Sequence, residues 1–214
     1  MNLPAIAERP KADADRKVLA PNLYFDRGLD IDAAKILPGE YYVTERDMVL
    51  VTVLGSCVTA CIRDKLSGIG GMNHFMLPDT NPDKDNPFGE SARYGTFAME
   101  ILINSLLKLG AHRTLLEAKV FGGGNVLPGM TVANVGQRNA DFVLRFLETE
   151  KIRVAAKDLV DVYPRKIYFF PKQNGRVLMK KLRAIHNDTI FVREKDYSSR
   201  LLSTQVAGEI ELFS

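Results

Sequence analysis

The first part of the chain carries apolar residues in short runs that predict β-strands. Residues 41–64 are rich in β-branched side chains, and polar or glycine-containing interruptions divide them into at least three strands. A second apolar run, residues 68–77, follows the turn-like segment DKLSG and stops at Pro78. Residues 79–91 come next and are rich in Pro, Asn and Asp, so they predict a polar loop.

After this loop the apolar positions change to the spacing of helices. Residues 93–109 predict an amphipathic helix, and Gly110 suits the left-handed residue that often ends one. A second helix is predicted to begin near Gln137. Its apolar positions are Ala140, Val143, Leu144 and Leu147. Between the two helices, residues 116–121 predict a strand that leads into the glycine run FGGGN, which we interpret as a tight turn from strand to helix.

The remaining apolar runs are short and predict further strands. These strands are expected at residues 153–159, 166–170, 189–193 and 210–213, while residues 177–184 form a basic stretch whose type the pattern does not decide. Strands and helices are mixed without a regular βαβα rhythm. This arrangement favours an α+β domain, with two main helices packed on mixed sheets, over a doubly wound fold.

Length and composition indicate one globular domain. The chain has 214 residues, of which 46% are hydrophobic and 26% charged, so it can build a full-sized core. Residues 1–22 are mostly polar, contain Pro4 and Pro10 and show no sustained periodicity, so we expect a flexible N-terminal arm. The folded domain is then predicted to span residues 23–214.

Charge and hydropathy exclude two classes of partner. The formal net charge is only +3, which does not predict a nucleic-acid-binding surface. No apolar run approaches the ~20 residues of a membrane-spanning helix, and the N-terminus lacks the apolar stretch of a secretory signal. We therefore expect a cytoplasmic protein without membrane insertion. In that reducing compartment the two cysteines, Cys57 and Cys61, would remain thiols.

The candidate chemistry lies in the antiparallel hairpin that residues 57–63 and 68–77 are predicted to form. If the loop of this hairpin is residues 64–67, Cys57 lies directly opposite His74, Thr59 opposite Met72 and Cys61 opposite Gly70. Opposed side chains of an antiparallel pair share one face, so a thiol would meet an imidazole. An adjacent imidazolium stabilises the thiolate, which is the nucleophilic form of cysteine.

The residues just before Cys57 also suit acyl transfer. Gly55 and Ser56 would let the backbone turn sharply and offer amide N–H groups to a developing oxyanion. Spacing alone leaves open that Cys57 and His74 are ordinary core residues. It also leaves open a zinc site formed by Cys57, Cys61 and His74, although a closed site needs a fourth ligand.

Two strings of this sequence resemble the CheD family of chemoreceptor glutamine deamidases. They are LGSCVTACIRD, residues 54–64, and GGMNHFMLP, residues 70–78. The later blocks ARYGTFAMEILINSLLKLGA, EAKVFGGGNV, VGQRNADFVLRFLE and RKIYFFPKQNGRV are similar to that family's blocks and follow the same order. The resemblance covers roughly residues 40–180.

The resemblance implies a function and a set of site residues. Cys57 and His74 match the family's catalytic pair, and Thr52 is the candidate third member. The implied reaction converts glutamine side chains of methyl-accepting chemoreceptors to glutamate with release of ammonia, in chemotaxis adaptation, and requires no cofactor and no metal. The resemblance also implies a sandwich of stacked mixed sheets flanked by helices.

Other functions remain open from the sequence. A CheC-type phosphatase is a further partner that the resemblance implies, and a non-catalytic adaptor that binds such a phosphatase is the main alternative. A pure adaptor would have no need for Cys57 and His74. A general thiol peptidase is a third, weaker alternative, and an experiment can distinguish it because it would cut the chain instead of changing a side chain.

Overall fold

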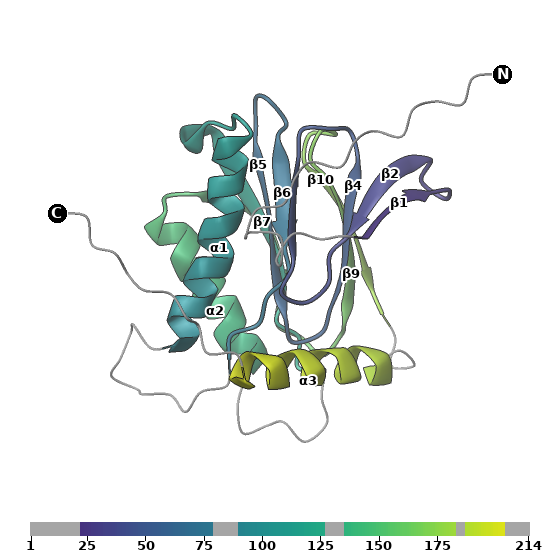
Figure 1. Ribbon diagram of the computed structural model, residues 1–214, viewed down its shortest axis with the longest axis vertical. Coiled ribbons are helices and arrows are strands. Elements are labelled where there is room, and N and C mark those ends of the chain that lie inside the picture. Colours follow the sequence, from purple (N-terminus) through teal and green to yellow (C-terminus); the bar gives the residue numbers. More distant parts are fainter. Residues whose placement is uncertain (1–21, 79–89, 127–134, 183–186, 204–214) are drawn as a thin grey trace.

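The computed structural model describes residues 22–78, 90–126, 135–182 and 187–203. Within them, two β-sheets face each other and three helices pack around them (Figure 1). Except for Asn22, the predicted arm of residues 1–22 lies outside the described residues, as does the strand predicted at 210–213. Among the described residues, no helix is long and apolar enough to span a membrane.

Each sheet has five strands and mixes parallel with antiparallel pairs. The first sheet has the order β1 (Asn22–Asp26), β2 (Ile31–Lys35), β4 (Val49–Leu54), β9 (Arg165–Phe170) and β10 (Arg176–Lys181). The second has the order β3 (Tyr41–Thr44), β6 (Gly70–Asn73), β5 (Val58–Asp64), β7 (Leu116–Gly122) and β8 (Arg153–Leu159). Residues 177–181 of the basic stretch of undecided type therefore lie in β10, an edge strand. The predicted α+β class with stacked mixed sheets is confirmed.

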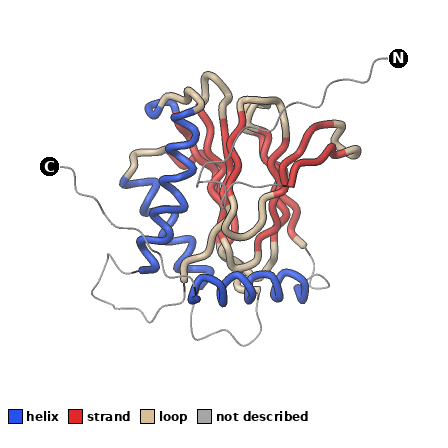
Figure 2. Tube along the Cα trace, viewed as in Figure 1, coloured by secondary structure: helices blue, strands red, loops and turns tan. Residues whose placement is uncertain are grey.

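Two helices cover one sheet and a third crosses the ends of both. Helices α1 (Glu90–Lys108) and α2 (Val135–Thr149) pack on the outer face of the sheet that holds β5, β6 and β7 (Figure 1). Helix α3 (Asn187–Ser203) lies across the lower ends of the sheets in this view (Figure 2). A short 3-10 helix (Arg113–Leu115) precedes β7.

The core has two main layers, and residues 55–57 cross the layer that lies between the two sheets. One layer lies between the helices and their sheet and includes Val58, Leu102 and Val143. The other lies between the two sheets and includes Cys57 and Phe169. Strand β4 belongs to one sheet and β5 to the other. The three residues between them, 55–57, thus carry the backbone across the sandwich.

The predicted register of the β5–β6 hairpin is wrong by two residues. Cys61 pairs with Met72 and Arg63 with Gly70, so Cys57 does not lie directly opposite His74. The turn lies one residue later than expected, because Asp64 N–H bonds to the carbonyl of Ile69 and leaves residues 65–68 as the loop, in which Gly68 adopts a positive φ of 72°. A shift of two residues leaves every side chain on its predicted face.

The strand predicted at residues 189–193 is also wrong, because these residues lie in α3. The buried positions of this helix are Ile190, Glu194 and Tyr197, which have helical spacing. The middle buried position is Glu194, and a sequence pattern treats Glu as a surface residue, so the helical spacing of the buried positions was not recognised. Without Glu194 the pattern shows only a short apolar run, and such a run is compatible with either a strand or a helix.

The other helices and strands predicted within the described residues agree with the structure. The helix expected at residues 93–109 is α1, and Gly110 after it has a φ of 96°. The helix expected near Gln137 is α2, with Ala140, Val143 and Leu147 buried. The strand expected at 153–159 is β8, and the one expected at 166–170 is β9.

Gly122 is the glycine whose replacement should disturb this architecture most clearly. Its φ is 113°, and an added Cβ would overlap the carbonyl oxygen of Cys57. We expect Gly122→Ala to lower the free energy of unfolding by about 1–3 kcal/mol, measured by urea denaturation. Gly28→Ala is the control, because a Cβ there would only reach the Asp26 carboxylate at 3.4 Å. Equal losses in the two variants would contradict the prediction.

Candidate active site

The segment Gly55-Ser56-Cys57 crosses between the sheets, and hydrogen bonds to its three carbonyl groups fix its orientation. The N–H of Gly124 bonds to the carbonyl of Gly55 at 2.8 Å, and the N–H of Gly123 bonds to that of Cys57 at 2.8 Å. The side-chain amide of Asn139 donates to the carbonyl of Ser56 at 2.9 Å. With its three carbonyls fixed on one side, the segment presents its amide N–H groups on the other.

Those three N–H groups form a cradle, and a carboxylate from α3 fills it. Glu194 Oε1 accepts from the N–H of Gly55 at 2.9 Å and from that of Cys57 at 3.1 Å. Glu194 Oε2 accepts from the N–H of Ser56 at 2.9 Å and from its hydroxyl at 2.6 Å. Converging backbone donors of this kind stabilise the oxyanion of acyl-transfer reactions. We call these donors of residues 55–57 the amide cradle.

His74 lies beside the cradle and is held by both sheets. It follows β6, and its backbone N–H and carbonyl bond to the carbonyl of Glu40 and the N–H of Gly39. Its Nδ1 lies 2.8 Å from the hydroxyl oxygen of Thr52, which comes from β4 in the opposite sheet. The structure therefore brings Thr52 and His74 into direct contact.

The hydrogen bonds of Thr52 define the tautomer of His74. The Thr52 hydroxyl donates its single proton to the carbonyl of Ile36 at 2.7 Å. The contact with His74 must then use Nδ1–H as the donor and Thr52 Oγ1 as the acceptor. Nε2 is left with a free lone pair, and it has no hydrogen-bond partner in the part of the chain that the structure describes.

Cys57, His74 and Glu194 meet at one point. The Cys57 Sγ, a ring nitrogen of His74 and a carboxylate oxygen of Glu194 all lie within 4.8 Å of one another. All three residues are buried, and the exposed fraction of Cys57 is 0%. The predicted pair therefore does share a site, although the two residues are diagonal instead of directly opposite in the hairpin.

Burial keeps this pair in its neutral forms. Loss of hydration raises the pKa of the Cys57 thiol well above its ordinary value, and the charge and hydrogen bonding of Glu194 raise it further. Burial also lowers the pKa of His74 to about 4, although the charge of Glu194 and the carbonyl of Ile36 oppose that shift. A neutral thiol and a neutral imidazole are the resting state of this arrangement.

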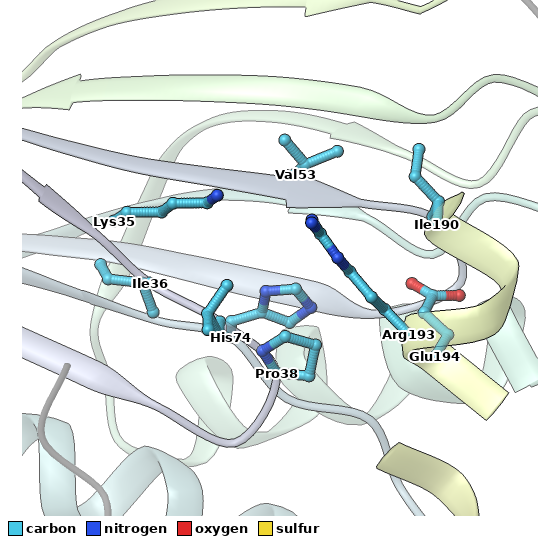
Figure 3. A pocket seen from close by; sticks show the side chains of 9 residues that line it. Lys35, Ile36, Pro38, Val53, His74, Ile190, Arg193 and Glu194 are labelled. Atoms are coloured by element: carbon cyan, nitrogen blue, oxygen red, sulfur yellow. The ribbon is translucent and has the colours of Figure 1, made fainter. Parts of the chain in front are cut away.

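Pro38, Ile36 and the α3 residues border the pocket beside His74. Figure 3 shows the His74 ring between Ile36 on the left and Arg193 and Glu194 on the right, with Pro38 below the ring. Lys35 and Val53 complete the side of the pocket that belongs to the β1–β2–β4 sheet. The site is thus enclosed mainly by the sheet ends and by α3.

Cys61 does not take part in this site. It is buried next to Met72, whose sulfur lies 3.4 Å from its Sγ. Among the described residues, the group that could ligate a metal ion is Cys57, His74 and Glu194, without Cys61. Both Glu194 oxygens already accept hydrogen bonds from the amide cradle. Glu194 is therefore better described as a carboxylate bound by the amide cradle than as a zinc ligand. The zinc site considered from the sequence, which included Cys61, does not fit this arrangement.

Sequence reasoning missed three contributors to the site. Glu194 was hidden in the segment predicted as a strand, and Asn139 was passed over as a polar position of a helix. Asn139 is fully buried and also accepts from the N–H of Leu77 at 2.9 Å. The glycine run is a support for the amide cradle and not a tight turn, since α2 begins only at Val135. For Asn139, the available signal was a polar residue on the otherwise apolar face of a predicted helix.

Comparisons with known proteins agree with this site. A family model described as CheD chemotactic sensory transduction matches residues 76–181. A protein of Methylobacillus flagellatus, named probable chemoreceptor glutamine deamidase CheD, is 65% identical over 91% of this chain and 96% of its own length. The chain belongs to the CheD family. The resemblance seen in the sequence motifs is confirmed.

Other comparisons extend this result. A Janthinobacterium protein with the same CheD name is 62% identical over 95% of this chain and 100% of its own length. A crystal structure of the Bacillus licheniformis hypothetical protein YfiH matches 57% of this chain and 49% of its own, at 12% identity and a TM-score of 0.32. That last likeness is too slight to support any conclusion, so the assignment to CheD depends on the sequence relatives.

The lowered pKa of His74 predicts how stability depends on pH. An unfolded histidine binds a proton near pH ~6.5, whereas folded His74 does so only near pH 4, so the unfolded state binds more protons between these values. Stability is therefore lost as the pH falls through this window. Going from about pH 7 to about pH 5 should remove about 2 kcal/mol that His74→Gln does not lose. Urea denaturation of both proteins at each pH measures this, and parallel losses would contradict it.

Proposed function

We propose that this protein is a chemoreceptor glutamine deamidase. It hydrolyses the side-chain carboxamide of receptor glutamines to a carboxylate and ammonia, with Cys57 as nucleophile, His74 as acid and base, and Thr52 as the residue that positions His74. The observation that carries this proposal is the meeting of Cys57, His74 and the amide cradle around one carboxylate. The close CheD relatives support the same reaction.

The first half of the reaction forms a thioester. Nε2 of His74 takes the proton of the Cys57 thiol, and the thiolate attacks the carboxamide carbon. The oxygen becomes an oxyanion that accepts from the cradle N–H groups of Gly55 and Cys57. His74 then returns its proton to the nitrogen as the C–N bond breaks, so ammonia leaves and an acyl-enzyme remains.

The second half regenerates the thiol. A water molecule enters the place of ammonia and gives a proton to His74 Nε2 while its oxygen attacks the thioester carbon. The C–S bond breaks, and the glutamate side chain leaves as Cys57 recovers its proton. Thr52 keeps Nδ1 protonated throughout, so that Nε2 is the nitrogen that exchanges protons. Every step uses side chains and backbone N–H groups of this chain, together with water.

The proposed substrate places the protein in the cytoplasm, next to receptor signalling helices. The names of the CheD relatives give chemoreceptor glutamines as the substrate, and Cys57, His74 and the amide cradle act on the carboxamide group alone. A CheC-type phosphatase partner stays a prediction. A non-catalytic adaptor would show no ammonia release, which separates that alternative from the enzyme.

The nucleophile can be tested with the two cysteines as a matched pair. Cys57→Ala should abolish ammonia release from a receptor cytoplasmic fragment, because the thioester can no longer form. Cys61→Ala should retain most of the activity and lose mainly stability, since Cys61 packs against Met72. Mass spectrometry of the receptor locates the converted glutamines. Activity that survives Cys57→Ala would overturn the proposed mechanism.

The protein substrate is tested with the same assay. Intact fragment, heat-unfolded fragment and free glutamine are compared at equal concentration. We expect release from the intact fragment and little from free glutamine. Equal release from free glutamine would contradict a protein substrate, and equal release from the unfolded fragment would contradict recognition of a folded helix.

Thr52 should affect turnover through His74. Thr52→Val removes the oxygen that accepts from Nδ1–H while keeping the shape of the side chain. We expect a loss of transition-state stabilisation of about 1–4 kcal/mol, seen in kcat/KM. Thr52→Ser keeps the hydroxyl and should recover most of the activity. Wild-type kcat/KM in Thr52→Val would mean that another group orients His74.

A further inference from the structure

The residue that fills the amide cradle has the chemistry of the proposed product. Glu194 carries the side chain that deamidation of a glutamine creates, and it is presented from a helix. Its carboxylate accepts four hydrogen bonds, three from backbone N–H groups and one from the Ser56 hydroxyl. Only 4% of Glu194 is exposed. Buried carboxylates are rare unless the fold provides such partners.

The Glu194 carboxylate lies so close to Gly55 that a side chain there would collide with it. An added Cβ at Gly55 would lie 2.8 Å from Glu194 Oε2 and 2.9 Å from the Cγ2 of Ile190. The absence of a side chain at Gly55 therefore makes room for both residues of α3. Because both carboxylate oxygens face N–H donors, the cradle satisfies a carboxylate better than a carboxamide, whose NH₂ group cannot accept.

Two further side chains fix α3 on this site. Ile190, four residues before Glu194, is 6% exposed, and Tyr197, three residues after it, is 5% exposed. The Tyr197 ring packs against Gly39, and its hydroxyl bonds to that of Tyr94 on α1. Positions four before and three after share one face of a helix. The opposite face, which includes Val192, is exposed.

This docking closes the site. Cys57 is 0% exposed and His74 2% exposed while α3 is in place. No receptor side chain can reach the thiol in this state, so α3 and a substrate exclude each other.

We propose that α3 is an intramolecular occupant of the substrate site, with Glu194 as a built-in mimic of the glutamate product. The surface beneath α3 receives the receptor helix that carries the target glutamine, and that helix must displace α3. This inference rests on the proposed function and deepens it. It also describes the substrate class, a helix with an apolar residue four positions before the glutamine and an apolar or aromatic residue three positions after it.

The decisive experiment turns the mimic into a substrate. In the full-length Glu194→Gln variant, the Cys57 thiolate should attack the introduced carboxamide, ammonia should leave, and water should hydrolyse the thioester. The product has the wild-type sequence. Mass spectrometry of the α3 peptide should show this conversion at a rate independent of protein concentration, because the reaction is intramolecular.

Two controls define the result. Glu194→Gln combined with Cys57→Ala should keep its carboxamide, because the nucleophile is missing. Val192→Gln places a carboxamide on the exposed face of the same helix and should remain unconverted. Conversion that needs Cys57 and occurs only at position 194 supports the proposal. Equal conversion at position 192 would overturn it.

The same preparations, given a receptor fragment, separate the two proposals. If receptor glutamines are converted while the carboxamide at position 194 persists, this inference fails and the proposed function stands. If the carboxamide at position 194 is converted and receptor glutamines are not, α3 is a substrate mimic and the receptor assignment fails. If neither is converted, the proposed function fails, and this inference fails with it.

Thiol alkylation tests the closure without any substrate. Glu194→Ala removes the four cradle bonds, so iodoacetamide should label Cys57 about tenfold faster or more than in the wild type. Val192→Ala, on the exposed face, should leave the rate unchanged. Cys61 should stay protected in all three proteins, which shows that the fold is intact. Equal labelling of Cys57 in the wild type and in Glu194→Ala would overturn the proposed closure.

Discussion

The site depends on the orientation of three consecutive peptide groups, residues 55–57, where the chain leaves one sheet for the other. Their carbonyls are held by Gly124, Asn139 and Gly123, and their N–H groups therefore point together to the opposite side. Backbone donors fixed in this way need no reorganisation when a charge appears among them. The glycine run and Asn139 act at a distance from the chemistry, yet without them the amide cradle would not face Cys57 and His74.

Burial and catalysis make opposite demands on Cys57 and His74. Closing the site removes water and raises the pKa of the thiol while lowering that of the imidazole, so proton transfer between them is unfavourable. The negative charge of Glu194 adds to this effect at the thiol. A substrate carboxamide brings no such charge, and its approach with water would restore part of the lost solvation. The resting state is thus both sterically and electrostatically inactive.

Local patterns predicted the parts of this molecule that depend on local interactions. Helices α1 and α2 and most strands follow from their periodicity. The predicted register of the hairpin was wrong, but Cys57 and His74 still share a face because a shift of two residues preserves faces. Thr52 reaches His74 from the opposite sheet, a relation that alternation along one strand cannot show. Glu194 lies 139 residues after Gly55. Because it is a charged residue at a buried position, the sequence pattern did not identify the helix that carries it. Contacts of such long range depend on the packing of whole layers, which the sequence pattern does not reveal.

An occupant tethered to its own site changes what a substrate must provide. A tethered group competes at an effective concentration that reaches the millimolar range, so a glutamine with weak contacts would rarely replace Glu194. A ligand shifts such an equilibrium only by its difference in affinity between the two states. The amide cradle prefers a carboxylate to a carboxamide, so the advantage of a substrate must come from contacts of its helix beyond the glutamine. Selectivity would then be decided by the surface that Ile190 and Tyr197 now cover, and chemistry would follow only after that surface has been exchanged.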